Sequence, residues 1–396
     1  MNVSPEILRA AADEIMDDVI GIRRHLHQHP ELSGEEKNTA AYIAEKCLQL
    51  GCDVRVGIGG HGIHAELSNQ TQPTAAKTIL LRADMDALPI QDGKECAYRS
   101  SVEGVSHACG HDVHSSILLG TLMLLKKLDI ELPYRVAAIF QPAEEITEGA
   151  SAMIKDGLLD HMDLYRAYAL HVYPYLPSGT IGLRAGPMCA AADMFEVEIT
   201  GRGGHAARPH ECIDVILIAS QIIQALHHII SRKVDPMHPA VLTIGQIEAG
   251  HAANVIPDKV RFSGTVRSLD TASHEEIRTR MDHIIRQTAE IWGATASFQM
   301  RHATPVLEND KTAVEDIRRI ISRISSDVPI VDIAEPSMGG EDFAEFLQHT
   351  PGCLMRLGTG DSPATRYPLH HGCFDIDEQA MRAGIMTLAS LCLGWK

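Results

Sequence analysis

The octapeptide HACGHDVH, residues 107–114, is the densest group of side chains that could do chemistry. Cys109 and His111 lie two residues apart, just before an apolar stretch that predicts a helix. On an extended approach to a helix, alternate residues point the same way. A thiolate and an imidazole placed in this way could ligate one metal centre. The alternative is a cysteine in a packed turn with surface histidines.

A second group, QPAEE at residues 141–145, directly follows the apolar run RVAAIF. It would place Glu144 and Glu145 at the carboxyl end of a strand, where open α/β sheets put their sites. Because successive residues point in different directions, one carboxylate could bind a metal while the other acts as a general base on the substrate water. An isolated pair of glutamates could equally be an exposed acidic turn.

Three weaker signals lie in LHV at 170–172, PLHHGCFD at 368–375 and LRADMDALP at 81–89. A histidine that ends a buried strand, such as His171, is often structural. An aspartate such as Asp86 can hydrogen-bond a metal-bound imidazole and fix its tautomer. Together these motifs supply the roughly five to seven protein ligands that two divalent ions with a shared bridge need.

The elements around these motifs predict an α/β layer. Strand, helix and strand alternate, which indicates a mostly parallel sheet built from βαβ units. Ser33 could cap a helix, with Glu36 as its capping-box partner, and Arg23 is expected on a solvated helix face. The expected strands are 77–83, 135–140 and 168–172, and the expected helices are 4–20, 35–50, 114–128, 312–325 and 376–393.

The pattern changes between residues 187 and 300 to β-α-β-β-α-β, a ferredoxin-like order. Its expected elements are a strand at 194–200, a helix at 213–230, strands at 240–249 and 255–267, a helix at 273–292 and a strand at 294–301. The first helix is apolar nearly all round, so we expect a partner subunit to cover part of it. The simplest division is a catalytic domain, 1–186 plus 301–396, interrupted by an inserted domain at 187–300.

Composition narrows the partners. The 396 residues carry a formal charge of 35 − 52 = −17, which argues against nucleic acid or an anionic membrane as a partner held by bulk charge. No basic leader or apolar run of about 18 residues is present, so no signal peptide or transmembrane helix is expected. Nine scattered cysteines then favour reduced thiols in a cytoplasm.

Long motifs in the same order resemble the dinuclear zinc-type metallopeptidase family that contains aminoacylases, in its branch of hippurate hydrolases and auxin-conjugate (IAA-amino acid) hydrolases. The motifs are IRRHLHQHPELSGEE (22–36), LRADMDALPI (81–90), HACGHDVH (107–114), IFQPAEE (139–145), LHVYPYLPSGTIG (170–182), GRGGHAARPH (201–210), ANVIPD (253–258), GGEDFAEF (339–346) and PLHHGCFDIDE (368–378). The resemblance implies a zinc-peptidase-like catalytic domain and an inserted lid and dimerisation domain. It also implies two divalent ions per subunit, whether zinc, manganese, cobalt or nickel.

Residue roles follow from the same resemblance. The positions that match metal ligands are Cys109, His111, Glu145, His171 and His370. Glu144 matches the general base and Asp86 the acidic residue that orients the site. His370 is preferred over His371 for its position after Leu369, and the neighbour stays open.

The inserted domain is expected to contact the substrate. His205 matches a histidine that reaches a substrate oxygen, often in the partner subunit of a dimer. Asn254 and Arg267 match contacts to polar groups of the substrate. Gly339 and Gly340 match a loop where glycine permits close approach of the substrate to the backbone.

The resulting hypothesis is a metal-dependent amidohydrolase that cleaves N-acyl amino acids with N-acetyl or aromatic, hippurate-like acyl groups, and that forms a homodimer or higher oligomer. A dipeptidase or carboxypeptidase would use the same ions and base. A metal-binding protein without catalysis and a thiol hydrolase with Cys109 as nucleophile are the remaining alternatives.

Overall fold

The computed structural model describes residues 3–67, 77–324 and 328–394, and the chain divides into two compact units. The main unit comprises the residues up to Gly186, Glu308–Glu335 and those from Asp342 onward. The inserted unit comprises Pro187–Leu307 and Pro336–Glu341. The expected boundary at residue 301 falls inside a strand, and residues 336–341 lie with the inserted unit because Ala190 N donates hydrogen bonds to Ser337 O and Gly339 O.

An eight-stranded mixed sheet forms the centre of the main unit, in the order β1-β2-β4-β3-β5-β16-β6-β15. Its strands are β1 (Asp53–Ile58), β2 (Gly62–Glu66), β3 (Thr78–Asp84), β4 (Arg135–Gln141), β5 (Leu164–Pro177), β6 (Ile181–Leu183), β15 (Ile330–Asp332) and β16 (Gly352–Gly360). The four central strands, β4, β3, β5 and β16, run parallel to one another. Their carboxyl ends therefore meet at one edge of the sheet.

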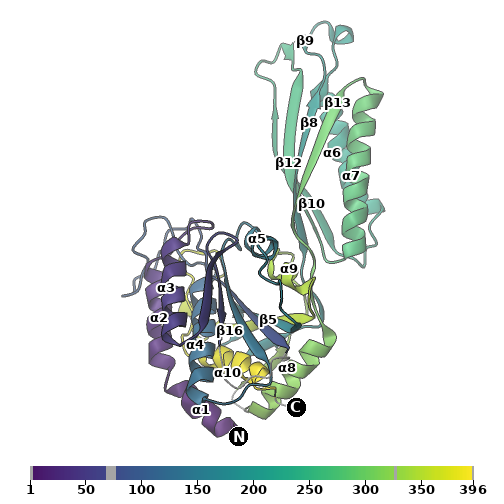
Figure 1. The fold of residues 1–396 in the computed structure, drawn as a ribbon. Helices are drawn as coiled ribbons and strands as arrows, with labels where there is room; N and C mark the ends of the chain where they lie inside the picture. The colour runs from purple at the N-terminus through teal and green to yellow at the C-terminus, as the bar shows by residue number, and fades with distance from the viewer. Residues whose placement is uncertain (1–2, 68–76, 325–327, 395–396) are drawn as a thin grey trace. The chain divides into compact units, whose positions relative to one another are not determined.

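Helices pack on this sheet (Figure 1). They are α1 (Pro5–Asp13), α2 (Met16–Gln28), α3 (Lys37–Gln49), α4 (His111–Leu128), α5 (Gly149–Lys155), α8 (Lys311–Ile324), α9 (Phe343–Leu347) and α10 (Ala380–Cys392). The apolar helix α4 contacts β3, α2 and α10, which explains why nearly all its faces are buried. The single helix expected at 4–20 is two helices, because the turn between them lets the consecutive residues Ile15 and Met16 both enter the core.

Two expectations at the start of the chain are wrong. Ser33 does not cap α3; the Glu31 carboxylate accepts the backbone N–H groups of Asn38 and Thr39 instead. Arg23 does not lie on a solvated face either, because its side chain is 1% exposed. Both residues turn out to belong to buried polar networks described below.

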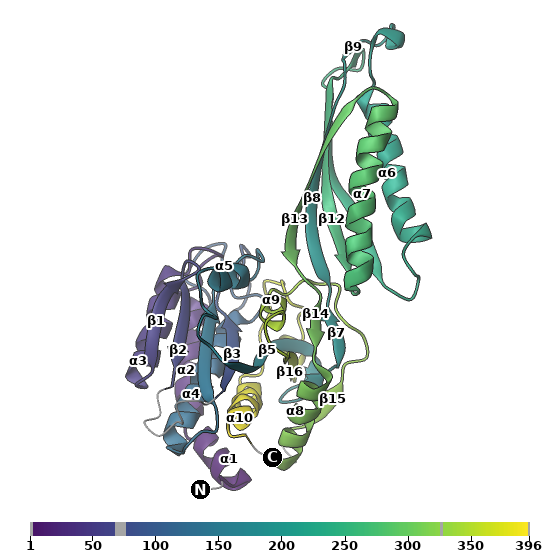
Figure 2. The ribbon, with the colours of Figure 1, turned by 45° about the vertical axis from the view of Figure 1, so that its right-hand side comes forward.

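The inserted unit is a four-stranded antiparallel sheet in the order β10-β12-β8-β13, with α6 and α7 on one face (Figure 2). Its elements are β8 (Ala191–Thr200), α6 (Val215–Arg232), β10 (Ala240–Ala249), β12 (Lys259–Ser268), α7 (Thr271–Ile291) and β13 (Thr295–Thr304). Two short ribbons pair β9 (Gly204–His205) with β11 (Val255–Ile256) and β7 (Gly186–Cys189) with β14 (Leu307–Asn309). The predicted fold class, an α/β unit with an inserted βαββαβ unit, is confirmed.

Helix α6 is amphipathic in its packing although it is apolar in composition. Ile218, Ile222 and Leu226 are buried in the core of the inserted unit. Ile216 and Leu217 are 46% and 59% exposed on another face. Its length and apolar content would suffice to cross a membrane, but its buried face makes it a core helix of this unit.

Candidate metal centre

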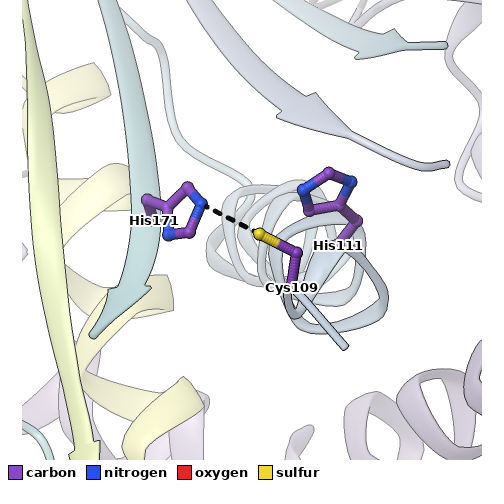
Figure 3. Close-up of side chains that lie close together, drawn as sticks. All are labelled: Cys109, His111 and His171. Carbon is purple, nitrogen blue, oxygen red and sulfur yellow. Dashed lines mark hydrogen bonds between the residues drawn. The ribbon is translucent and has the colours of Figure 1, made fainter. Parts of the chain in front are cut away.

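A left-handed turn at Gly110 brings the first cluster of the sequence against β5. Gly110 has φ = 84°, and a Cβ atom there would lie 2.5 Å from Val172 Cγ2, so glycine is required. The turn places Cys109 just before α4 and His111 as its first residue. Cys109 Sγ lies 3.6 Å from His171 Nε2 (Figure 3).

The partners of His171 leave one nitrogen available to a metal. Its Nδ1 lies 2.8 Å from the carbonyl oxygen of Val172, which can only accept, so Nδ1 carries the proton. Nε2 therefore presents its lone pair toward Cys109. Burial, together with the nearby His114 and Arg356, holds the pKa of His171 well below its usual range, and the neutral ring is the form that binds metals.

Asp86 fixes the tautomer of His111, as the carbonyl of Val172 does for His171. His111 Nδ1 lies 3.0 Å from Asp86 Oδ1, while Asp86 Oδ2 accepts from the Ser33 hydroxyl at 2.7 Å and from Glu145 N at 3.0 Å. The hydrogen bond to Asp86 places the proton of His111 on Nδ1 and turns Nε2 toward the two glutamates. Burial alone would lower the pKa of His111, but the charge of Asp84 and the hydrogen bond to Asp86 raise it well above the usual value.

Glu145 lies between two histidines that are 259 positions apart in the chain. Its Oε1 is 3.7 Å from His111 Nε2 and 3.5 Å from His370 Nε2. Glu144 Oε2 is 3.8 Å from His111 Nε2. Within the described ranges, neither His111 Nε2 nor Glu145 Oε1 has a hydrogen-bond partner, although both atoms are buried.

The geometry distinguishes His370 from His371. His370 adopts φ = 63°, and its backbone N–H donates to Ala108 O at 2.8 Å, which places the residue beside Cys109. The neighbouring side chains of Cys109 and Glu145 raise the pKa of His370 to about 10. His371 instead accepts the N–H of Cys373 and stacks on Tyr367 at 4.7 Å.

We call Cys109, His111, Glu144, Glu145, His171 and His370 the His111 cluster. Its potential ligand atoms fall into overlapping groups in which they lie within 4.8 Å of one another. Metal–ligand bonds of about 2.1 Å in a tetrahedral site put neighbouring ligand atoms about 3.4 Å apart, close to the spacings found here. Two buried atoms without partners and a set of thiol, imidazole and carboxylate donors therefore fit divalent cations.

Asp84 and His114 lie next to this cluster with their polar atoms already engaged. His114 Nε2 accepts the N–H of Val172 at 2.9 Å, so its Nδ1 donates to Asp84 Oδ1 at 2.6 Å. Asp84 Oδ2 accepts from Arg82 at 2.7 Å. These contacts fix the strand ends that carry the cluster.

The predicted substrate contacts of the inserted unit fall into two groups. His205 and Asn254 lie together, since β9 pairs with β11 and Ala206 N donates to Asn254 O. Arg267 donates to Met338 O at 2.9 Å, beside Gly339 and Gly340. The two groups adjoin opposite ends of β12, about 26 Å apart at 3.3 Å per residue.

Sequence reasoning missed Glu36 as a residue of the site. Its side chain is fully buried, and its carboxylate accepts the backbone N–H of Ala143, the residue before Glu144. In the sequence, Glu36 is interpreted as the capping-box partner of Ser33. The preceding Glu31 could have argued against that interpretation, because Glu31 is a second candidate for capping α3 and is the residue that does so.

Residues 80–393 match the model of peptidase family M20/M25/M40. The chain belongs to this family. The predicted aminoacylase and amidohydrolase branch of family M20 is confirmed by relatives along nearly the whole chain.

Three relatives illustrate the range of the family. The chain is 42% identical over 365 residues to an N-acetyl-L-cysteine deacetylase of Bacillus subtilis, covering 92% of this chain and 84% of the relative. It is 37% identical over 392 residues to thermostable carboxypeptidase 1 of Saccharolobus solfataricus, covering 98% of each. The YXEP protein of Bacillus subtilis, a solved dinuclear metal-binding peptidase of family M20, superposes with a TM-score of 0.82 at 33% identity, covering 96% and 98% of the two chains.

The M20 chain described here is thus a metal-dependent hydrolase of the EC 3.5.1 or 3.4 type. Two divalent metal ions are its cofactor, and its donor clusters suit them. Among its relatives are a deacetylase of an N-acyl amino acid and a carboxypeptidase.

Proposed function

We propose that the protein hydrolyses the amide bond of N-acyl amino acids with N-acetyl or aromatic, hippurate-like acyl groups, and that Glu144 is the general base. The observation that carries the proposal is the divergence of two adjacent carboxylates. Glu145 Oε1 lies between His111 and His370, whereas Glu144 Oε2 lies 3.8 Å from His111 Nε2. The deacetylase relative at 42% identity supports the acyl amino acid over a longer peptide.

The same distances support the ligand assignment. The residues proposed to hold the two cations are Cys109, His111, Glu145, His171 and His370. Asp86 would keep His111 in the tautomer that binds a metal. Divalent cations in such a site act as Lewis acids and make a water nucleophilic near neutral pH.

The residues of the chain then divide the remaining work. Glu144 takes the proton of the attacking water and later passes it to the leaving amine. His205 donates a hydrogen bond to the oxyanion that develops on the acyl carbonyl. Arg267, Asn254 and the Gly339–Gly340 loop bind polar groups of the substrate.

We propose that His205 and Asn254 act on the site of a partner subunit. The separation of about 26 Å along β12 supports this, because the group at Arg267 and the group at His205 adjoin opposite ends of one strand. A homodimer through the inserted unit is supported by the exposed apolar face of α6 and by the edge strand β10, where Val241 and Ile247 are 42% and 55% exposed. An open strand edge and an apolar helix face are surfaces that a second copy can cover.

A complementation experiment tests this arrangement. Glu144→Gln and His205→Ala homodimers, each inactive alone, are dissociated, mixed and reassociated. If His205 acts across the dimer, mixed dimers hold one intact site and about a quarter of wild-type activity returns at random pairing. A mixture that stays inactive while mixed dimers form would place His205 on its own subunit's site.

The function itself is tested with a substrate panel: N-acetyl amino acids, hippurate, auxin conjugates and dipeptides. Enzyme loaded separately with zinc, manganese, cobalt or nickel is assayed, with the Glu144→Gln variant beside it. We expect deacylation to exceed dipeptide hydrolysis, and the variant to lose about 10³-fold or more in kcat with unchanged metal content by elemental analysis. Near-normal turnover by that variant would remove Glu144 from its role.

A carboxypeptidase or dipeptidase is the second candidate, favoured by the carboxypeptidase relative at 37% identity. It predicts the reverse preference in the same panel. We also propose the cytoplasm as the location, in keeping with nine cysteines that are all free.

A further inference from the structure

Glu36 is a buried carboxylate that the proposed reaction does not use. Its side chain is 0% exposed at the start of α3. Oε1 accepts two backbone N–H groups, Gly34 N at 2.9 Å and Ala143 N at 2.8 Å, whereas Oε2 is buried and has no hydrogen-bond partner among the described residues. Burying a carboxylate costs free energy, so we expect the contacts of Glu36 to serve a function.

Its second partner, Ala143, has an unusual backbone. Ala143 adopts φ = 54°, a left-handed conformation that residues with a Cβ rarely take. The carbonyl of Ala143 is held by Glu148 N and Gly149 N at 3.2 Å each. The amide N–H of Ala143 depends on Glu36, which comes from a segment 107 residues away.

The turn at Ala143 determines where the next two side chains point. The backbone of Glu145 is held as well, because its N–H donates a hydrogen bond to Asp86. The close packing of Gly149 against Pro142 supports a rigid turn. A Cβ atom on Gly149 would lie 1.6 Å from the backbone oxygen of Pro142, so a larger residue does not fit there. Strain of this kind persists only where the surroundings hold it, and it gathers at functional sites.

We propose that Glu36 is a positioning residue: its carboxylate holds Ala143 in the left-handed conformation and thereby aims the carboxylate of Glu144. Ser33, three residues earlier, braces Asp86 through its hydroxyl. The segment SGEE, residues 33–36, therefore supports both acidic residues that flank His111. The proposal rests on the assignment of Glu144 as the base.

The test compares Glu36→Met, which fills the space without an acceptor, with Glu36→Gln, which keeps one acceptor oxygen. We expect the Met variant to lose about tenfold or more in kcat, with two metals still bound and KM within about twofold of the wild type. The Gln variant should stay within about threefold of wild-type kcat. Elemental analysis and circular dichroism establish that each preparation is loaded and folded.

Glu31→Ala is the matched control. Glu31 also accepts two backbone N–H groups at the start of α3, but these belong to Asn38 and Thr39, away from Ala143. This variant should lower the Tm and leave kcat unchanged. A Met variant whose kcat per bound metal equals that of Glu31→Ala would show that Glu36 is merely structural and would overturn the proposal.

A rescue experiment separates positioning from general damage. Glycine adopts positive φ without strain, so adding Ala143→Gly to Glu36→Met should recover part of the lost kcat. No recovery would overturn the proposal, and so would a Gln variant as slow as a Met variant. Failure of Glu144→Gln to lose activity would instead defeat the proposed function, so the two failures are distinguishable.

Discussion

Successive residues at the start of α4 belong to two buried charged clusters, which differ in how closely their opposite charges approach each other. His111 faces the proposed metal ligands, whereas Asp112 faces a group that we call the Arg23 cluster: Arg23, His27, Asp92, Asp112, Asp375 and Glu378. In the Arg23 cluster, Asp112 Oδ2 accepts from Arg23 at 2.9 Å and from His27 at 2.8 Å. Arg23 also donates to Asp375 at 2.7 Å and to Glu378 at 3.2 Å.

The difference lies in how closely opposite charges approach. Pairs in the Arg23 cluster are at hydrogen-bonding distance, although one oxygen of Asp112 has no hydrogen-bond partner in the described part of the chain. In the His111 cluster, the imidazole and carboxylate atoms stand 3.5 to 3.8 Å apart, and two of them have no hydrogen-bond partner among the same residues. Groups that are held apart in this way contribute little to the stability of the chain alone. A bound cation would satisfy several of these atoms at once.

Removal of the metals should have the largest effect, because it should disable the His111 cluster and leave the Arg23 cluster intact. Exhaustive chelation should abolish hydrolysis, by about 10³-fold or more, because without the cations Glu144 would have to deprotonate a water of ordinary pKa. The fold should survive, since the Arg23 cluster and the core need no cation, while the Tm falls as the binding free energy is lost. Activity that persists in protein shown to be metal-free would contradict the assignment, and so would unfolding on chelation.

A substitution in the Arg23 cluster should lower the stability of the protein with or without metal, whereas a substitution in the His111 cluster should mainly prevent metal binding. Arg23→Met should cost about 3–5 kcal/mol of unfolding free energy with or without metal, because it removes the guanidinium that compensates the buried charge of Asp112. His111→Ala should change the stability of the metal-free protein much less, yet abolish metal loading. Urea denaturation of both variants, with and without chelator, measures this. Equal losses in the metal-free state would remove the distinction between the clusters.

The sequence predicted the His111 cluster because its residues are local to short motifs at strand ends. It did not reveal the Arg23 cluster, since the partners Asp375 and Glu378 lie more than 350 positions from Arg23 and a pair of arginines fits a solvated helix equally well. Long-range pairing of this kind follows from topology and not from local pattern.

The central strand β16 was missed for a different reason. Its sequence GCLMRLGTG contains three glycines, which lower strand propensity. At Gly352 a Cβ would lie 2.0 Å from Ala167 O, so glycine is required by the close approach of β5. Packing against a neighbour outweighs propensity here, and that neighbour is not visible in the local sequence.

The smallest expected effect is a difference in pH dependence between the clusters of the metal-free protein. In the Arg23 cluster, burial would raise the pKa of Asp112, but Arg23 and His27 hold it well below its usual range. A depressed pKa gives stability that is present above the unfolded value of about 3.9 and is lost as pH falls below it. In the His111 cluster, the neighbouring Cys109 and Glu145 raise the pKa of His370 to about 10. A raised pKa gives stability that is complete below the unfolded value of about 6.5 and is lost as pH rises toward 10.

Urea midpoints of chelated protein should therefore fall below about pH 4 through Asp112, and His370 should add a decline as pH rises from about 6.5 toward 10, on top of the contributions of His111 and His171. The alkaline decline is shallow, because the His370 side chain is 53% exposed and solvent screens its charge. Bound metals prevent protonation of the histidines, so metal-loaded protein should lose the alkaline decline and keep the acid one. The His370→Ala variant, chelated, is the matched control, because it keeps His111 and His171, and its alkaline decline should be smaller than that of the chelated wild type. The same pH dependence in the two chelated proteins between about pH 6.5 and 9 would show that the neighbours of His370 do not raise its pKa, and the contrast between the clusters would then rest on distances alone.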